Sequence, residues 1–293
     1  MKSGYVTILG RPNVGKSTLL NMIIGEKLSI ISDKPQTTRE RINLIYNDDD
    51  MQIIFIDTPG MQNPRNKLGT YMLNESKASA KDSDVLIYMT DNSDYIGRQD
   101  TEILEFLKTM EQPIICVINK IDIMDKKTLA EIMMMYSELQ IFSEIIPISS
   151  LNASDVKLFM NALKKYIPDG PRYYPEDYIT DKSEKFIVSE IIREKTLKYL
   201  RDEIPHGIAI EIEHMKEFAN ENKFEISATI FCERESHKGM VIGKGGQMIK
   251  KIRLAAKKDI ELFLNAKVFL ELYVKVEKDW RQKDGKVKSF GYK

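Results

Sequence analysis

Apolar and polar positions in the first 167 residues form short β-rich runs separated mostly by longer amphipathic segments, such as 16–25 and 101–110. The short runs lie at 5–10, 41–47, 51–57, 85–91, 113–120 and 144–150. Apolar strands that alternate with amphipathic helices predict an α/β fold, with a mainly parallel sheet covered on both faces. Residues 41–57 differ, because two strands flank an acidic turn and leave no room for a helix. They predict a hairpin and therefore one antiparallel edge strand.

The order of elements changes in the second part of the chain. Its pattern predicts a long helix, two strands, a glycine loop with a helical region, and a final strand, which is a small α+β domain of order αββααβ. These elements are expected at 183–204, 207–218, 223–234, 243 to about 265, and 267–280. Between the two parts, Ile167–Asp181 contains three prolines, a glycine and several charges, which is typical of a linker. We therefore expect one domain over 1–170, a linker over 171–182 and a second domain over 183–293.

Length and composition agree with this division, and they restrict the cellular compartment and the class of partner that we expect. A chain of 293 residues can bury two cores. The formal charge is zero overall, but residues 234–293 carry 16 lysines and arginines against 7 acidic residues, which favours a polyanionic partner. Cys116 and Cys232 have neither metal-site nor disulfide spacing, so a reducing cytoplasm is expected. The sequence shows no signal pattern and no apolar run of the roughly 18 residues that span a bilayer.

The first motif that carries chemistry follows the first apolar run and has the pattern G-x-x-x-x-G-K-[ST]. Glycines at both ends let the backbone approach a ligand, so that several N–H groups point at an anion. The following helix N-terminus adds partial positive charge, the lysine can reach β/γ-phosphates, and the first hydroxyl can coordinate Mg²⁺. The expected phosphate-binding residues are Gly10, Arg11, Pro12, Asn13, Val14, Gly15, Lys16, Ser17 and Thr18.

Two further motifs indicate the chemistry and the base. The sequence "DTPG" (Asp57, Thr58, Pro59 and Gly60) ends the third strand, where the carboxylate can hold Mg²⁺ and the last amide can touch a γ-phosphate. "NKID" (Asn119, Lys120, Ile121 and Asp122) ends the fifth strand. A carboxylate there can accept hydrogen bonds from N1–H and the 2-amino group of guanine, which adenine cannot donate. Three such motifs in this order predict binding of GTP and GDP.

These motifs resemble the translation-factor-related P-loop GTPases across the whole first domain. The resemblance implies further roles. Thr38, in preference to Thr37, matches the threonine that coordinates Mg²⁺ and senses the γ-phosphate, so that Ser17, Thr38 and Asp57 would be the metal ligands. Ser149 and Ser150 match the loop whose backbone contacts guanine O6.

The hydrolytic machinery departs from the Ras type at one position. A glutamine that orients water follows D-x-x-G in Ras-type GTPases, and here Met61 stands in its place. In the similar G-x-P-N-x-G-K-[ST] loops the asparagine coordinates K⁺, which implies the same role for Asn13. The residues expected to take part in catalysis are therefore Lys16, Thr38, Gly60 and Asn13. Without a positive finger, which is worth roughly 10³ to 10⁵ in rate, intrinsic hydrolysis should be slow.

The glycine loop of the second domain is Gly243, Lys244, Gly245 and Gly246, a G-x-x-G followed by a helix. Lys250, Arg253 and Lys257 fall on one side of that helix, opposite an apolar stripe. A G-x-x-G in the order αββααβ resembles the type II KH domain, in which the loop lets an unpaired nucleic-acid backbone approach closely. The resemblance implies that these seven residues bind RNA.

A GTPase domain joined to a C-terminal KH domain resembles the Era-like (TrmE/Era) family of bacterial ribosome-assembly GTPases over nearly the full chain. What the resemblance implies is binding near the 3′ end of 16S ribosomal RNA, assistance in assembly and maturation of the small (30S) ribosomal subunit, and partial peripheral association with the inner membrane. We expect a monomer, since neither domain shows a surplus apolar face. Two alternatives stay open: a signalling GTPase whose C-terminal domain binds a protein or anionic membrane, and a general NTP hydrolase with a basic appendage.

Overall fold

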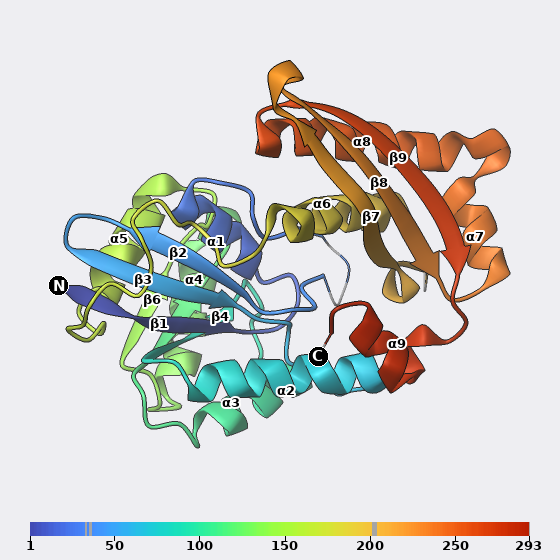
Figure 1. The fold of residues 1–293 in the computed structure, drawn as a ribbon. Coiled ribbons are helices and arrows are strands. Elements are labelled where there is room, and N and C mark those ends of the chain that lie inside the picture. The colour runs from blue at the N-terminus through green and yellow to red at the C-terminus, as the bar shows by residue number, and fades with distance from the viewer. Residues whose placement is uncertain (33, 35–36, 201–203, 293) are drawn as a thin grey trace. The chain divides into compact units, whose positions relative to one another are not determined.

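The structure is a computed structural model that describes all residues except 33, 35–36, 201–203 and 293. The chain forms two compact units. The first comprises Met1–Ser29, Thr38–Pro64 and Met72–Asp181, and the second comprises Ile30–Thr37, Arg65–Tyr71 and Lys182–Lys293. Each unit is built around its own sheet (Figure 1).

The first unit contains a six-stranded sheet in the order β2-β3-β1-β4-β5-β6. Its strands are β1 (Lys2–Leu9), β2 (Ile42–Asn47), β3 (Met51–Asp57), β4 (Val85–Thr90), β5 (Ile114–Ile118) and β6 (Glu144–Pro147). Within this sheet, the described strand pairs are parallel except for β2–β3, which is antiparallel. The expected α/β fold, a mainly parallel sheet with one antiparallel edge strand, is thereby confirmed.

Helices cover both faces of this sheet (Figure 1). They are α1 (Lys16–Ile24), α2 (Lys67–Lys81), α3 (Arg98–Leu107), α4 (Lys126–Ser137) and α5 (Ala153–Leu163). Every residue of β3, β4 and β5 is buried, because side chains on both faces of these strands pack against helices. One core cluster joins α2, α3 and α4 to β4 and β5 through residues such as Ala80, Leu104, Tyr136 and Tyr88. The parallel arrangement brings the carboxyl ends of β1, β3, β4 and β5 to one edge of the sheet, where the nucleotide motifs begin.

Residues 171–181, inside the predicted linker, run along the open edge of β2. The Ile45 amide donates to the Ile179 carbonyl at 2.9 Å, and Leu44 forms a β-bridge with Thr180. Gln52, which is fully buried, holds the same segment by accepting from the Tyr173 amide at 2.7 Å. The segment therefore satisfies backbone groups that a bare edge strand would leave exposed.

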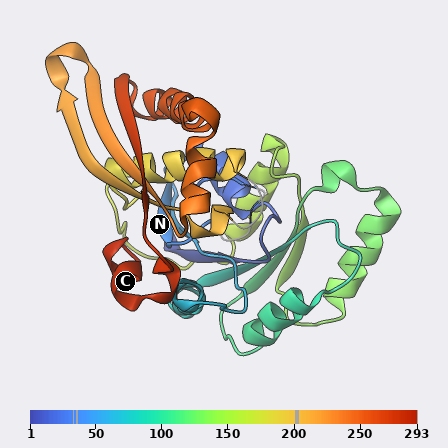
Figure 2. The same cartoon turned by 90° about the vertical axis from the view of Figure 1, so that its right-hand side faces the viewer.

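The second unit contains the sheet β7-β8-β9, with β7 (Ala209–Phe218) antiparallel and β9 (Lys267–Val276) parallel to the central β8 (Lys223–Cys232). Its main helices are α6 (Glu184–Tyr199), α7 (Glu235–Ile242) and α8 (Gln247–Leu264). They lie on one face of the sheet (Figure 2). Val268 and Leu270 of β9 are buried while Phe269 between them is exposed, as expected for a sheet covered on one side. The order αββααβ of these elements is that of the predicted KH fold.

The C-terminal end differs from the prediction. The last strand ends at Val276 instead of continuing to Trp280, which begins a short 3₁₀ helix ahead of α9 (Asp284–Ser289). Trp280 is fully buried, stacks on Tyr292, and donates from Nε1 to the Gly207 carbonyl at 2.9 Å. The predicted strand was wrong here because burial of the indole turns the chain back after β9. The first helix of the second domain, expected at 183–204, ends at Tyr199 in the structure. Most of the remaining expected range, 201–203, lies outside the described residues.

No helix within the described part of the chain is both long and apolar enough to cross a membrane.

Candidate guanine-nucleotide site and candidate RNA interface

The loop from Gly10 to Ser17 turns tightly between β1 and α1, and its glycines have a packing reason to be there. A Cβ at Gly10 would lie 2.2 Å from the Met89 carbonyl oxygen, and one at Gly15 would lie 2.1 Å from Nδ2 of Asn119. Gly15 also has φ 108°, which side chains other than hydrogen rarely allow. A larger residue at Gly10 would require the β4 backbone to shift, and one at Gly15 would require the Asn119 carboxamide to move.

Lys16 lies at the centre of this loop. Its ammonium group is buried and donates to the carbonyl oxygens of Gly10 at 3.0 Å and Arg11 at 2.7 Å. Burial lowers the pKa of Lys16 to about 8, although the charge of Asp57 opposes this shift. A buried ammonium that is solvated by backbone carbonyl oxygens is well placed to be neutralised by the phosphates of a nucleotide.

The residues expected to hold Mg²⁺ fit the ion. Asp57 is fully buried, and its Oδ2 accepts from the Ser17 hydroxyl at 3.1 Å. Its Oδ1 has no hydrogen-bond donor among the residues the structure describes. Burial raises the pKa of Asp57, partly offset by the charge of Lys16 and by neighbouring hydroxyls that include Thr38. A buried carboxylate oxygen without a donor, next to a hydroxyl, is a suitable partial oxygen environment for Mg²⁺.

The two switch threonines have different surroundings. The Thr37 hydroxyl donates to the Lys34 carbonyl at 2.5 Å. The Thr38 hydroxyl is instead one of the hydrogen-bonding groups that lower the pKa of Asp57. Gly60 lies beside the phosphate loop, since a Cβ there would be 3.5 Å from Cγ of Pro12. The arrangement places Thr38 and Gly60 near the predicted phosphate site, and the choice of Thr38 over Thr37 stays a prediction.

Other residues of the "DTPG" motif stabilise their own loop. The fully buried Thr58 hydroxyl donates to the Ile8 carbonyl at 3.0 Å, and the Pro59 carbonyl accepts from the Ser76 hydroxyl at 2.6 Å. The Met61 side chain is buried in the core cluster against the helices. These hydrogen bonds stabilise the loop, while the Met61 side chain forms part of the core.

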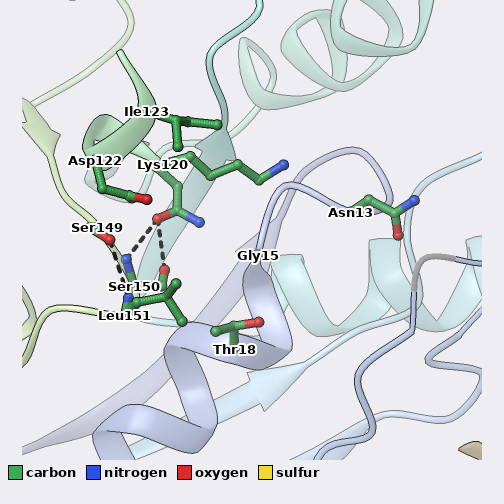
Figure 3. Close-up of a pocket in the computed structure, with 10 residues that line it drawn as sticks. Asn13, Gly15, Thr18, Lys120, Asp122, Ile123, Ser149, Ser150 and Leu151 are labelled. Carbon is green, nitrogen blue, oxygen red and sulfur yellow. Dashed lines mark hydrogen bonds between the residues drawn. The ribbon is translucent and has the colours of Figure 1, made fainter. Parts of the chain in front are cut away.

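A pocket of about 250 Å³ opens between the phosphate loop and the loops after β5 and β6 (Figure 3). This volume is slightly below the range of about 300–1,000 Å³ that is usual for small-molecule sites. Its lining consists of Asn13, Gly15, Thr18, Asn119, Lys120, Asp122, Ile123, Ser149, Ser150 and Leu151. Residues from three motifs that are distant in the sequence therefore face one cavity, as the guanine-site prediction requires.

Asn119 connects the three loops of the pocket. Its Nδ2 donates to the Val14 carbonyl at 2.7 Å, and its Oδ1 accepts from the amide and hydroxyl of Ser150 at 2.9 and 2.8 Å. The carboxamide nitrogen carries a second hydrogen, which remains available for N7 of a purine. The sequence placed Asn119 in a base-binding motif but did not predict this bracing role.

The sequence did not predict two other features of the nucleotide site. Ile123 and Leu151 line it with largely exposed apolar side chains, and each directly follows a predicted binding residue, which was the only available signal. Asp91, at the end of β4, accepts from Lys120 Nζ at 3.1 Å and from Arg11 Nη2 at 2.9 Å. No motif marked Asp91.

The glycine loop of the second unit is open. Gly243, Gly245 and Gly246 all have positive φ, of 75°, 57° and 76°. A Cβ at Gly243 would collide with Met248 Cβ at 2.6 Å, whereas Cβ atoms at Gly245 and Gly246 would meet nothing within 4 Å. Gly243 thus has a packing role, while the other two leave free space beside the backbone, as close approach of a nucleic-acid strand requires.

The three basic side chains predicted on one side of α8 differ in their exposure to solvent. Lys250 is exposed, Arg253 is half-buried, and the partly exposed Lys257 pairs with Glu261 at 3.6 Å. On the opposite side Ile252, Ala256 and Ile260 are buried, and Ile249 and Phe263 at the ends of the stripe are half-buried. The helix therefore presents basic groups next to the glycine loop while its apolar stripe forms core.

Comparison with known proteins identifies the family. The protein-family model described as "50S ribosome-binding GTPase" matches residues 5–120, and the model described as "KH domain" matches residues 203–281. GTPase Era of Clostridium kluyveri is 53% identical over 293 residues, which are 100% of both chains. The chain belongs to the Era family of GTPases. The resemblance noted in the sequence is confirmed, and with it the expectation of a GTPase.

Other Era proteins agree over the same length. GTPase Era of Alkaliphilus metalliredigens is 49% identical over 291 residues, 99% of each chain. A crystal structure of Era in complex with MgGDPNP and nucleotides 1506–1542 of 16S ribosomal RNA matches with a TM-score of 0.95 and 41% identity, covering 100% of this chain and 99% of that one. A variant of Aquifex aeolicus Era bound to GDP·AlF₄⁻ matches with the same values. The P-loop GTPase and KH folds of this Era-family chain are therefore established.

Proposed function

We propose that this protein is a GTP-switched factor that binds 16S ribosomal RNA near its 3′ end and assists assembly and maturation of the small (30S) ribosomal subunit. The observation that carries the proposal is the presence, in one chain, of a nucleotide cradle and an open G-x-x-G loop, together with full-length similarity to an Era structure that holds both MgGDPNP and 16S rRNA nucleotides. Its substrate is GTP and its product GDP.

At the nucleotide site, each residue has a proposed task. The phosphate-loop amides and Lys16 bind the phosphates, Asp122 and Asn119 recognise guanine, and the backbone of Ser149 and Ser150 contacts O6. Mg²⁺ would be held by Ser17, Thr38 and Asp57, and when bound it supplies positive charge to the phosphate oxygens. The Gly60 amide contacts the γ-phosphate, so that Thr38 and Gly60 report whether GTP or GDP is bound.

Hydrolysis is proposed to be slow and potassium-stimulated. Met61 is buried and carries no group that could orient water. Asn13 has φ 67° at the rim of the loop, and Figure 3 shows it on the opposite side of Gly15 from Asp122. An asparagine held there, away from the base, is suited to place a monovalent cation beside the phosphates. Equal turnover in sodium and potassium buffers would remove this part of the proposal.

At the second site, the G-x-x-G loop admits the backbone of an unpaired RNA strand, and Lys250, Arg253 and Lys257 contact its phosphates. Lys244 lies in the loop and is exposed. Three such contacts to a single strand predict a slope of about −2 in the dependence of log affinity on log salt concentration.

The organisation of the chain is proposed as a GTPase domain over 1–170, a linker over 171–182 and a KH domain with a basic tail over 183–293. The protein is proposed to act as a monomer in the cytoplasm, with part of it associated peripherally with the inner membrane.

RNA binding by the full chain tests the central proposal. Gly245→Asp places a negative charge in the loop, at a left-handed backbone that Asp tolerates better than most residues and in open space, so that the fold should be kept. Gly285→Asp in α9 is the matched control, because it is exposed and also meets nothing within 4 Å. With RNA from the 3′ end of 16S rRNA, Gly245→Asp should lower affinity by about tenfold or more and leave GTP turnover intact.

Unchanged RNA affinity of Gly245→Asp would contradict the role of the loop. If wild-type protein bound anionic vesicles or a protein but not this RNA, the alternative of a signalling GTPase would replace the proposal.

A further inference from the structure

Two cations of the nucleotide site converge on one carboxylate. Asp91 directly follows β4, and each of its oxygens holds one partner: Oδ1 accepts from Arg11 Nη2 at 2.9 Å, and Oδ2 accepts from Lys120 Nζ at 3.1 Å. The Ser93 hydroxyl donates to Oδ1 at 2.9 Å. Arg11 belongs to the phosphate loop, and Lys120 lines the base pocket. One side chain therefore connects the two halves of the site.

The Arg11 end of this connection is rigid. Arg11 Nε forms an ion pair at 2.9 Å with Asp100, which is fully buried and accepts from the Tyr88 hydroxyl at 2.7 Å. The Arg11 carbonyl accepts from Lys16 at 2.7 Å. The guanidinium group is thus fixed from two sides by carboxylates, and its backbone is fixed by the catalytic lysine.

The Lys120 end requires support. Lys120 has φ 66° and ψ 34°, a left-handed conformation that costs a residue with a side chain of order 1 kcal/mol. Its side chain is about one-third exposed, with a value of 34%, so the stem alone is not held by packing. The bond to Asp91 is the one described side-chain hydrogen bond of its ammonium group among the residues that the structure covers. It directs the stem along the pocket wall.

Asp91 is suited to this task because it stays ionised. Burial opposes its ionisation, but hydrogen bonds from Lys120 and Ser93, together with the charges of Lys120 and Arg11, hold its pKa below the ordinary value.

We propose that Asp91 is a positioning residue for guanine recognition: it anchors the Lys120 ammonium so that the Lys120 stem forms a flat wall for the base, and it ties that wall to the phosphate loop through Arg11. The inference rests on the assignment of this pocket as the guanine site. Asp91 acts through Lys120 on binding and does not touch the reacting phosphate.

The test is a mutant cycle in the full-length protein. Asp91→Asn keeps the shape and removes the charge, and Lys120→Met keeps an apolar stem and removes the ammonium. Each should raise the Kd for GDP and the KM for GTP about tenfold, which is the loss expected for one charge-assisted hydrogen bond, with kcat within about twofold. The double variant should lose no more than either single variant, because both changes break the same contact. Asp91→Glu, which retains the charge, should recover part of the loss.

Asp94→Asn is the matched control. It makes the same charge change three residues away in the same loop, at an exposed carboxylate, and should leave GDP binding unchanged. Asp91→Asn with the same Kd as Asp94→Asn would overturn the proposal, and so would full affinity in Lys120→Met. Losses that multiply in the double variant would show that Asp91 does not act through Lys120, and would equally overturn the proposal. If wild-type protein bound no GDP, the guanine-site assignment itself would be wrong. Wild-type binding of GDP therefore distinguishes a failure of the Asp91 proposal from a failure of the guanine-site assignment.

Discussion

Replacing Gly15 by alanine should disconnect the phosphate loop from the loops that bind the base. The added Cβ would lie 2.1 Å from Asn119 Nδ2, far inside van der Waals contact, so the Asn119 carboxamide must move away. That group makes three hydrogen bonds, one to the Val14 carbonyl and two from Ser150, at 2.7, 2.9 and 2.8 Å. A single methyl group would therefore release the brace that holds the three loops of the pocket together.

The magnitude follows from these contacts. Three buried hydrogen bonds at about 1 kcal/mol each amount to about 3 kcal/mol. Alanine at φ 108° adds about 1 kcal/mol of backbone strain. If the hydrogen-bond loss falls on the organisation of the site, about 3 kcal/mol corresponds to roughly a hundredfold weaker binding of GDP.

Gly25→Ala separates the collision from the strain. Gly25 has φ 80° but would meet nothing within 4 Å, so its variant carries the same kind of backbone cost without a clash. It should lower Tm by about 2–4 °C and leave the Kd for GDP unchanged, both measured on nucleotide-free protein by thermal unfolding and calorimetric titration. Asn119→Ala, which removes the brace directly, should lose at least as much affinity as Gly15→Ala. The reasoning is refuted if Gly15→Ala binds GDP as tightly as Gly25→Ala.

Three further outcomes are expected. Burial places the pKa of Lys16 at about 8, below its ordinary 10.5, so the free protein loses this proton as pH rises through 8. GDP affinity should therefore fall by up to about tenfold from pH 7 to pH 9. A GDP affinity that stays constant over this range would contradict the pKa shift. Trp280→Phe should lower the free energy of unfolding by about 2 kcal/mol in urea titrations, since it leaves the Gly207 carbonyl without its indole donor. An unchanged urea midpoint would show that this hydrogen bond does not contribute to stability. Thr38→Ala should slow GTP hydrolysis by about tenfold or more at unchanged GDP affinity, while Thr37→Ala should not; the reverse ranking would exchange their roles.

Much of the nucleotide site could be predicted because its parts are local. A tight turn between a strand and a helix depends on glycines that are neighbours in the chain, and apolar periodicity reports which faces of a segment are buried. The phosphate loop, "NKID" and the G-x-x-G loop were therefore visible as motifs. Parallel strands also bring their carboxyl ends to one edge, so the meeting of the phosphate loop and "NKID" in one pocket followed from the expected topology.

Local sequence patterns could not show which side chains from distant segments contact one another. The Arg11–Asp91 and Asn119–Val14 contacts join residues that are 80 and 105 positions apart, and no spacing rule relates them. The segment 171–181 shows prolines and charges typical of a linker, yet its backbone pairs with β2. The end of the last strand was placed too late because Trp280 continues a strand-like pattern.

The sequence by itself determined the two folds, the guanine-nucleotide chemistry and the open glycine loop, because each depends on backbone geometry set by adjacent residues. Only the tertiary structure decided which side chains brace the pocket, where β9 ends, and how the edge of β2 is covered. The physical reason is that buried polar groups and large rings must find partners in space, and those partners come from whichever segments the fold brings within hydrogen-bond or van der Waals distance.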